Sequence, residues 1–499
     1  MRRESVADQG FNPEGVNVKH PGKVWIGGAW RAANSGRFIE LISPNTEQVV
    51  GAVAEADEAD MDAAVAAARE AFDHGAWPRM SVAERNEVMK KISAHLKTRD
   101  TELAKAWTAQ MGGLATFAPG MVAGALIQFD QTREVGATFE YVQERQTPAA
   151  AIAYIVHEPV GVVASIAPWN GPFGIMASKV ANALITGCTV IMKPSPETPL
   201  EAYIIAEACE AAGVPAGVVN LVCGHREAAD HLVCNPGVDK VSFTGSTVAG
   251  KRIASVMGAR IGRYTLELGG KSAAIVRDDF SAEETAKLMT GTLMLLSGQV
   301  CAMLSRLIVP RSRQDEIADA IAAEMAQVKI GHSDDPTTVL GPLAMKRQLE
   351  RVESYIEEGK KTADLVYGGN RPAHLNQGYF IEPTLFKNVD NKSRIAQEEI
   401  FGPVLSIIPV EDEADAIRVA NDSNYGLSGA VLTKDPQAAF DVARQIRTGG
   451  IAQNGLKVDW SLPFGGYKQS GVGREGGVDG LMAYLEVKTM YMDAPVEAA

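Results

Sequence analysis

The chain has 499 residues, a formal net charge of -13, 46% hydrophobic residues and 22% charged residues. This length exceeds what one ordinary core supports, so we expect two or three domains of ordinary soluble globular composition. The acidic balance argues against nucleic acid and anionic membrane surfaces as partners, because both require a concentrated basic face. No window approaches the roughly 18 consecutive apolar residues of a membrane helix, so we expect no membrane insertion.

The cysteines and the N-terminus bear on location. The first segment, MRRESVADQGFNPEG, has two arginines but no following apolar core, so we expect no signal peptide. No C-x-x-C pair occurs, and His225 and His231 have the wrong spacing for zinc, so no metal site is expected. A reducing cytoplasm is the simplest location for the few cysteines, which are Cys188, Cys209, Cys223, Cys234 and Cys301.

The predicted elements begin with an amphipathic surface helix over 58–73, which has an alanine face. Residues 138–159 and 483–493 alternate polar and apolar side chains without helical punctuation. We expect exposed strands there, of the kind that often pairs with another subunit.

From residue 161 the chain alternates short β-rich runs with helical stretches. The expected strands are 161–168, 189–194, 217–224 and 239–246. The expected helices are 178–185, 200–213, 226–235 and 248–259. This alternation predicts a parallel sheet wrapped by helices, a doubly wound α/β domain that binds ligands at the carboxyl ends of its strands. A second α/β series runs from 264–276 through 306–310 to 449–455.

Several glycine patterns suggest a nucleotide site, and one of them is well placed. ELGGKS ends like a phosphate-binding loop, but Thr265 occupies the position of its first glycine. GVGREG matches G-x-G-x-x-G literally, but no strand precedes it and too little chain follows. FTGSTVAG follows a predicted strand and opens a helix, so amides around Gly245 and Ser246 could face an anion, or form only a tight turn.

Three side chains are candidates for chemistry. Asn170 follows a buried strand and could donate to an oxyanion, although a turn Asn bonded to its own backbone is commoner. Glu267 lies between leucines, where a raised pKa would suit a general base, although a carboxylate paired with a nearby cation is the alternative. Cys301 could be a nucleophile, although most single cysteines are small buried hydrophobes.

The order of the motifs is more specific than any one of them. PWN, KPSPETP, FTGS, LELGGK, GQVC, EEIFGPV and PFGGYKQSGVGREGG resemble, in order and spacing, those of the aldehyde dehydrogenase superfamily. The resemblance covers roughly Gly22 to Lys488, and the 34 residues from Glu267 to Cys301 (301 − 267) fit the family's base and nucleophile.

The resemblance implies a catalytic role for each candidate. Cys301 would form a thiohemiacetal with the aldehyde, and Asn170 would hold the oxyanion together with the Cys301 backbone N–H. Loss of a hydride to nicotinamide would then give a thioester, and Glu267 would activate the water that hydrolyses it. Lys179 and Glu475 match a pair that relays protons out of the site. Because members that transfer the acyl group to coenzyme A generally lack the glutamate, Glu267 favours release of a free acid.

The resemblance also implies a site for NAD, with NADP possible. Lys193 would bond the adenosine ribose, Glu399 would hold the nicotinamide ribose, and Phe401 would pack near the nicotinamide ring. The full set of expected cofactor-binding residues is Ile166, Pro168, Trp169, Lys193, Ser195, Gly245, Ser246, Glu399 and Phe401.

The implied architecture is two doubly wound α/β domains, a Rossmann-type cofactor domain and a catalytic domain, with a β oligomerisation arm. Residues 1–137 and 159–268 would form the cofactor domain and 269–478 the catalytic domain. Residues 138–158 and 479–499 would form the arm of a homodimer or homotetramer.

The chain departs from many relatives at two places. Pro196 replaces the glutamate that bonds the adenosine 2′-hydroxyl, and the acid has moved to Glu197, so we expect NAD with some use of NADP. Gly171 and Ser178 replace an aromatic residue and a tryptophan of the substrate tunnel.

Apolar residues accompany this loss of volume, namely Leu295, Leu296, Met303 and Trp460. They favour a bulky apolar aldehyde, long-chain or aromatic, unless Phe173, Phe117 or Met121 refills the gap. The alternatives are a semialdehyde-specific or coenzyme A-acylating enzyme, or a non-catalytic structural relative.

Overall fold

The computed structural model describes residues 10–496 of the chain. The N-terminal segment for which we expect no signal peptide lies outside the described residues over its first nine positions. The strands are β1 (Val24–Ile26), β2 (Ala29–Arg31), β3 (Phe38–Ile42), β4 (Val49–Ala54), β5 (Val142–Arg145), β6 (Ile152–Pro159), β7 (Val162–Ile166), β8 (Thr189–Lys193), β9 (Val219–Leu221), β10 (Lys240–Thr244), β11 (Arg263–Glu267), β12 (Ser272–Val276), β13 (Leu304–Pro310), β14 (Asp364–Tyr367), β15 (Thr384–Lys387), β16 (Val404–Val410), β17 (Tyr425–Gly426), β18 (Gly429–Leu432), β19 (Ala452–Gln453), β20 (Tyr467–Lys468), β21 (Gly471–Val472) and β22 (Leu485–Met492).

The α-helices connect these strands. They are α1 (Glu58–Asp73), α2 (Val82–Lys97), α3 (Asp100–Met111), α4 (Ala118–Thr138), α5 (Pro172–Thr186), α6 (Leu200–Ala211), α7 (Arg226–Cys234), α8 (Thr247–Ala259), α9 (Ala282–Met294), α10 (Gln314–Met325), α11 (Lys346–Thr362), α12 (Arg394–Gln397), α13 (Glu413–Asn421), α14 (Pro436–Ala443) and α15 (Gly477–Met482). Short 3-10 turns are η2 (Trp77–Arg79), η3 (Leu295–Gly298) and η4 (Arg311–Arg313). The four strands and four helices predicted between residues 161 and 259 are confirmed, as is the helix over 58–73.

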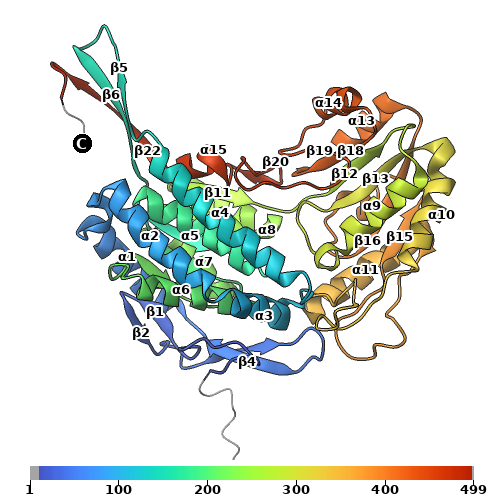
Figure 1. Ribbon diagram of the computed structural model, residues 1–499, viewed down its shortest axis with the longest axis horizontal. Helices are drawn as coiled ribbons and strands as arrows, with labels where there is room; N and C mark the ends of the chain where they lie inside the picture. The colour runs from blue at the N-terminus through green and yellow to red at the C-terminus, as the bar shows by residue number, and fades with distance from the viewer. Residues whose placement is uncertain (1–9, 497–499) are drawn as a thin grey trace, which may run out of the picture.

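The first sheet, on the left in Figure 1, has the strand order β2-β1-β9-β8-β7-β10-β11-β21 among the described residues. Its five central strands are parallel, and their order β9-β8-β7-β10-β11 is 3-2-1-4-5 when counted along the chain. The direction of winding therefore reverses between β7 and β10. In open α/β sheets a ligand binds at the carboxyl ends of the strands next to such a reversal.

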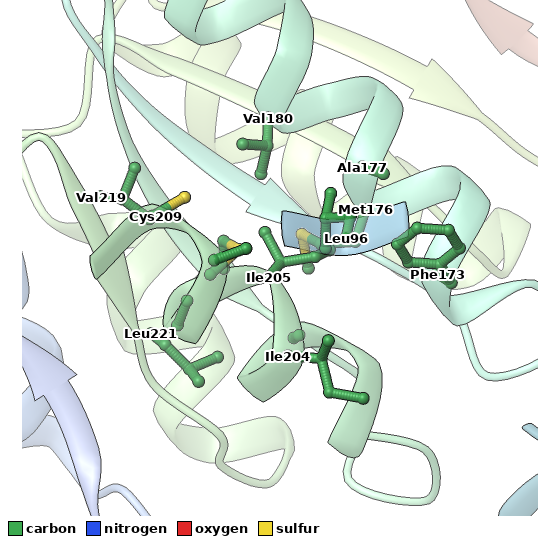
Figure 2. Packing of buried hydrophobic residues seen from close by; sticks show 14 of the residues in the cluster. Leu96, Phe173, Met176, Ala177, Val180, Ile204, Ile205, Cys209, Val219 and Leu221 are labelled. Carbon is green, nitrogen blue, oxygen red and sulfur yellow. The ribbon is translucent and has the colours of Figure 1, made fainter. Parts of the chain in front are cut away.

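Helices cover both faces of the first sheet because its strands are apolar on both sides. Val163 packs with α2 to α6 on one face, whereas Val162 and Ala164 pack with α1, α7 and α8 on the other. Figure 2 shows the first of these cores, where Phe173 and Met176 of α5 lie near Leu96 of α2. The two hydrophobic cores, one on each face, therefore fix the positions of the strands that carry the site.

The second sheet, on the right in Figure 1, has the order β14-β15-β16-β13-β12-β18-β19 within the described part of the chain. Its strands are parallel except for β14 at one edge. Helices α9 and α10 pack on one face with Met289 and Ile317, and α11 and α13 pack on the other with Val352 and Val419. This is a second doubly wound α/β unit, as predicted.

A three-stranded antiparallel sheet, β22-β6-β5, projects from the first unit in the described structure (Figure 1). β22 pairs with β6 from Leu485↔Pro159 to Met492↔Ile152, so the tail strand predicted near residue 490 is confirmed. The hydroxyl of Tyr154 also donates to the carbonyl of Val496. The use of this sheet as an oligomerisation arm stays a prediction.

The chain returns to the first sheet after it has formed the second. β21, which lies inside the rejected GVGREG pattern, pairs antiparallel with β11 at the edge of the first sheet. The exact domain boundaries drawn from the sequence stay a prediction. Among residues 10–496, no helix is long and apolar enough to cross a membrane.

Candidate active site

The carboxyl ends of four adjacent strands place predicted site residues in one row. Ile166 at the end of β7 is the register partner of Lys193 at the end of β8 and of Phe243 in β10. Thr244 of β10 is in turn the partner of Glu267 at the end of β11. Residues of the predicted site that are up to 101 positions apart (267 − 166) therefore lie along one sheet edge.

A cavity of about 880 Å³ opens at this edge, between α7 and α8. Its lining includes Ile166, Phe243 and Ser246, which lie at the two strands where the winding reverses. This is the position that the fold offers to a dinucleotide.

The FTGS turn follows one of the two alternatives that the sequence left open for Gly245. The backbone N–H of Gly245 donates to the carbonyl of Glu267 at 3.0 Å, so this amide does not face an anion and fits the tight-turn alternative, and the place of Gly245 beside a cofactor stays a prediction. A side chain at this position would also meet the ring of Phe243. Ser246 caps α8 by accepting from the N–H of Ala249. The backbone N–H groups that could still bind an anion are those after Gly245, in the first turn of α8.

The nucleophile loop precedes β13 and has an unusual backbone. Leu296 and Ser297 adopt φ values of 49° and 55°, a left-handed conformation that costs free energy in residues other than glycine. Side-chain contacts hold it: the hydroxyl of Ser297 donates to the carbonyl of Gly341 at 2.9 Å. The side chain of Gln299 donates to the carbonyl of Leu296 at 2.9 Å and accepts from the N–H of Ala344 at 3.0 Å.

Asn170 is tied to this loop. Its side-chain amide Nδ2 donates to the backbone carbonyl of Gln299 at 2.9 Å, and its backbone carbonyl accepts from the indole N–H of Trp107 at 3.1 Å. One Asn170 N–H is therefore used to hold the segment two residues before Cys301, and the second remains available as a donor. The structure thus brings Asn170 and Cys301 together, and sequence reasoning had assigned no role to Gln299.

Cys301 lies against the segment that connects β11 of the first sheet to β12 of the second. A Cβ atom at Gly270 would overlap the backbone carbonyl of Cys301, so only glycine permits this approach. Burial raises the pKa of the Cys301 thiol to about 12, and the negative charges of Glu399 and Glu267 add to the effect. The backbone N–H groups of Cys301 and Ala302 act in the opposite direction. In the free protein the sulfur is therefore mainly a thiol at neutral pH.

Glu267 is the most exceptional carboxyl group of the site. It is 3% exposed, and neither carboxylate oxygen has a hydrogen-bond partner among the described residues. Burial raises its pKa well above the usual range, the charge of Glu475 raises it further, and Lys179 and Arg474 oppose this. Gly465 makes room, because a Cβ there would come within 2.6 Å of Glu267 Oε1. The alternative of a direct ion pair with a neighbouring cation is not what the structure contains.

Lys179 and Glu475 form a buried ion pair with a very short contact. Lys179 Nζ also donates to the hydroxyl of Ser242 at 3.1 Å, and the Tyr484 hydroxyl donates to the same oxygen at 3.0 Å. The charges of both residues shift the pKa of Glu267, so the pair lies beside the candidate base.

Glu399 and Phe401 come from the loop before β16. The N–H of Gly270 donates to Glu399 Oε1 at 3.1 Å, and a Cβ at Gly269 would overlap the Glu399 carboxylate. Burial raises the pKa of Glu399 to about 7, against the effect of the Gly270 N–H. Phe401 has a left-handed φ of 64° and packs edge-on against Trp169 with ring centroids 5.2 Å apart. The two glycines of LELGG thus permit close contact with both Cys301 and Glu399, a role that the sequence alone did not indicate.

The remaining predicted cofactor residues lie beside this row. Burial lowers the pKa of the Lys193 ammonium, which makes no hydrogen bond within the described residues. Ser195 donates to the carboxylate of Glu197 through a short hydrogen bond. Pro168 and Trp169 follow β7 and are half-buried. A dinucleotide would fit three features of this region: the cavity where the strand order reverses, the buried ammonium of Lys193, and the N-terminus of α8 capped by Ser246. In the described part of the chain, no group of three or more His, Cys, Asp and Glu side chains could hold a metal ion.

Comparisons with known proteins agree with this arrangement. The model of the "Aldehyde dehydrogenase family" matches residues 30–490. A geranial dehydrogenase from Castellaniella defragrans is 40% identical over 472 residues, covering 94% of this chain and 98% of that protein. A 3-succinoylsemialdehyde-pyridine dehydrogenase from a Pseudomonas species is 41% identical over 471 residues, covering 93% and 97%.

A solved structure of a mutant of aldehyde dehydrogenase C from Pseudomonas syringae, complexed with NAD+ and octanal, is similar to this fold. It superposes with a TM-score of 0.91 at 37% identity, covering 96% of this chain and 98% of that one. The chain belongs to the aldehyde dehydrogenase family, and it is an NAD(P)-dependent aldehyde dehydrogenase.

Proposed function

We propose that this enzyme oxidises an aldehyde to the free carboxylic acid through a covalent intermediate on Cys301, with Glu267 as the base. The observation that carries the proposal is the Glu267 carboxyl group, which is buried and unpaired beside the Cys301 thiol. A carboxylate without partners in a poorly solvated position keeps a high pKa and is a strong base for water.

The chain's own groups account for each step. The Cys301 thiol gives its proton to the Glu267 carboxylate, from which it leaves before hydrolysis, and Sγ bonds to the carbonyl carbon, which places a negative charge on the substrate oxygen. The free N–H of Asn170 and the backbone N–H of Cys301 donate to that oxygen. When bound, the nicotinamide cofactor accepts a hydride from this carbon. Glu267 then takes a proton from water, the resulting hydroxide attacks the thioester, and the C–S bond breaks to release the acid and the thiolate.

A proton left on Glu267 has to reach solvent before the next turnover. The buried pair of Lys179 and Glu475 is charged, close to Glu267, and joined to Ser242 and Tyr484 by hydrogen bonds. This arrangement supports its use as the relay, because a chain of donors and acceptors can move a proton without moving heavy atoms.

For the substrate we propose a bulky apolar aldehyde, long-chain or aromatic. The start of α5 presents Gly171, Gly174 and Ser178, so small residues follow at helical spacing. A Cβ at Gly171 would meet only Ile175, at 3.3 Å. Near the nucleophile, Leu295 and Leu296 line a cavity of about 280 Å³ together with Phe117.

Of the side chains that could have refilled this space, Phe173 lies elsewhere, whereas Phe117 is one wall of the 280 Å³ cavity. Phe173 is 5% exposed and packs in the core of the first unit, as Figure 2 shows. Phe117 and Met121 remain 39% and 38% exposed. Among the relatives, geranial and octanal are apolar aldehydes named with their proteins, which supports the same choice. The semialdehyde relative keeps a semialdehyde substrate as the alternative.

The test is a spectrophotometric screen of straight-chain, aromatic and charged aldehydes, with and without coenzyme A. We expect kcat/KM to rise by up to about fourfold per added methylene, which corresponds to about 0.8 kcal/mol each. Gly171→Phe should lower kcat/KM for decanal and leave propanal unchanged, whereas Gly258→Phe, on an open face of α8, should change neither. A preference for acetaldehyde or a charged semialdehyde would refute the substrate class, and an absolute need for coenzyme A would refute hydrolysis.

NAD is the cofactor we propose for the cavity at the first sheet, since the Pseudomonas syringae structure contains NAD+. The projecting β22-β6-β5 sheet supports a homodimer or homotetramer, because its exposed Val487 and Tyr491 offer apolar surface for pairing. All five cysteines are free, and we propose a cytoplasmic location on that basis.

A further inference from the structure

An ion pair joins the two units at the rim of the first sheet. Glu197 lies four residues after the end of β8, and Arg347 is the second residue of α11 in the other unit. Their atoms Oε1 and Nη2 are 2.6 Å apart, and Ser195 donates to the second carboxylate oxygen. Figure 1 shows α6, which follows Glu197, in the left unit and α11 in the right one. Both oxygens of Glu197 are therefore occupied by groups of this chain.

These residues form one charged group with Lys193, which we call the rim group: Lys193, Ser195, Glu197 and Arg347. Lys193 is the register partner of Ile166, and Ile166 lines the 880 Å³ cavity, so the rim group begins one strand away from that cavity, at the same sheet edge. The charge of Glu197 acts on the Lys193 ammonium. Two cations and one anion leave the rim group with a formal charge of +1.

Dinucleotide sites of this fold class use one of two residues near the adenosine ribose. A carboxylate accepts from the 2′-hydroxyl of NAD and repels the 2′-phosphate of NADP, whereas an arginine accommodates that phosphate. In this chain both residue types occur at the same place and are bound to each other. The side chain of Arg347 is 65% exposed, so its other guanidinium N–H groups can face a phosphate while Nη2 keeps its contact with Glu197.

We propose that Arg347 is a specificity-determining residue, which admits the 2′-phosphate of NADP by neutralising Glu197 and contacting the phosphate. The inference rests on the proposed placement of the cofactor at the first sheet. It explains how an acid at the rim need not exclude NADP, because the acid is already paired with a cation from the opposite unit. A 2′-hydroxyl gains little from Arg347, so NAD binding depends on it weakly.

The two rim charges act in opposite directions on the choice of cofactor. Arg347→Gln leaves a rim charge of zero and an unpaired Glu197, so NADPH should bind about tenfold more weakly, as for loss of a hydrogen bond to a charged group. NADH should change by less than about twofold. Glu197→Gln raises the rim charge to +2, so NADPH should bind more tightly and NADH less tightly.

The test is equilibrium binding of NADH and NADPH, followed by nicotinamide fluorescence, to the full-length wild type and the variants. Lys346→Gln is the matched control: it removes a charge from the adjacent, 72% exposed residue of α11, whose partner is Glu350. It should leave the NADPH/NADH ratio unchanged. Thermal melting checks that each variant is folded. The NADPH effect should also weaken at high salt, because the contact is electrostatic and exposed.

The inference is overturned if Arg347→Gln keeps the wild-type ratio of dissociation constants, or if the control changes the ratio equally. It is also overturned if the wild type binds NADH but not NADPH. These results leave the proposed function intact when NAD-dependent aldehyde oxidation persists. If the wild type binds neither coenzyme, the cofactor placement and this inference fail together.

Discussion

The two sheets contribute to the site through opposite ends. In the first sheet, Lys193 and Glu267 end their strands, and Asn170 and Ser246 follow the ends of theirs. In the second sheet, Cys301 precedes β13 by three residues, and Glu399 and Phe401 precede β16. The carboxyl ends of one doubly wound sheet thus face the amino ends of another.

This difference changes how the side chains are held. At the carboxyl ends, register pairs such as Thr244↔Glu267 fix the backbone directly. On the second sheet's side, the backbone is left-handed at Leu296, Ser297 and Phe401 and relies on contacts with distant residues. The base and the cofactor cavity therefore lie on the hydrogen-bonded strands of the first sheet. The nucleophile lies in a strained loop that contacts with distant residues stabilise.

The largest expected effect follows from removing the second sheet's chemical group. Cys301→Ala should lower NADH production by at least about a thousandfold, because no other group can form the covalent intermediate. NADH binding should persist, since the carboxyl ends of the first sheet are untouched. Steady-state rates and fluorescence titration measure the two quantities. A variant that retains substantial turnover would contradict the covalent route.

A smaller effect follows from removing the first sheet's base. Glu267→Gln should lower kcat about a hundredfold and leave a rapid burst of NADH, since thioester hydrolysis becomes limiting. Because the pKa of Glu267 is raised, the base is protonated at low pH and kcat of the wild type should climb as pH rises. The variant should lose this climb. Stopped-flow traces across pH test both points, and an unchanged profile would exclude Glu267 as the base.

The smallest effects are expected at Gly269 and Gly270, in the segment between the two sheets, which we call the seam. The two substitutions should change different kinetic parameters. Gly270→Ala pushes on the Cys301 carbonyl and should lower kcat by about tenfold or more, as for a displaced reacting group. Gly269→Ala pushes on Glu399 and should instead raise KM for NAD. Gly258→Ala, in open space on α8, is the control. If both seam variants changed the same kinetic parameter equally, the two glycines would not act separately on the nucleophile and on Glu399.

The contrast between the sheets also explains what could be predicted from sequence. Buried strands alternating with helices indicate where carboxyl ends lie, so Asn170, the FTGS turn and Glu267 could be singled out from the residues themselves. Glu399 and Phe401 precede their strand, where no general rule directs attention, and only the resemblance to a family indicates them. Cys301 also precedes its strand, and from the residues alone it is a candidate nucleophile that cannot be told from a small buried hydrophobe.

Other features depend on tertiary contact and leave no local signal. The partner of the Gly245 N–H is a carbonyl on the neighbouring strand, so a pattern of glycines could not reveal it. Gln299 acts through Asn170, 129 positions away, and Arg347 meets Glu197 across 150 positions (347 − 197). Side chains that matter because of what they touch become visible only after the chain is folded.

The return of the chain to the first sheet has a consequence for the order of synthesis. β21 and Glu475 emerge after every strand of the second sheet has been made. Until then, β11 has a bare edge and the ammonium of Lys179 has no counter-charge in an apolar interior. A nascent chain that ends before residue 471 therefore lacks part of the first sheet and of the site, and it can become active only after β21 has paired with β11.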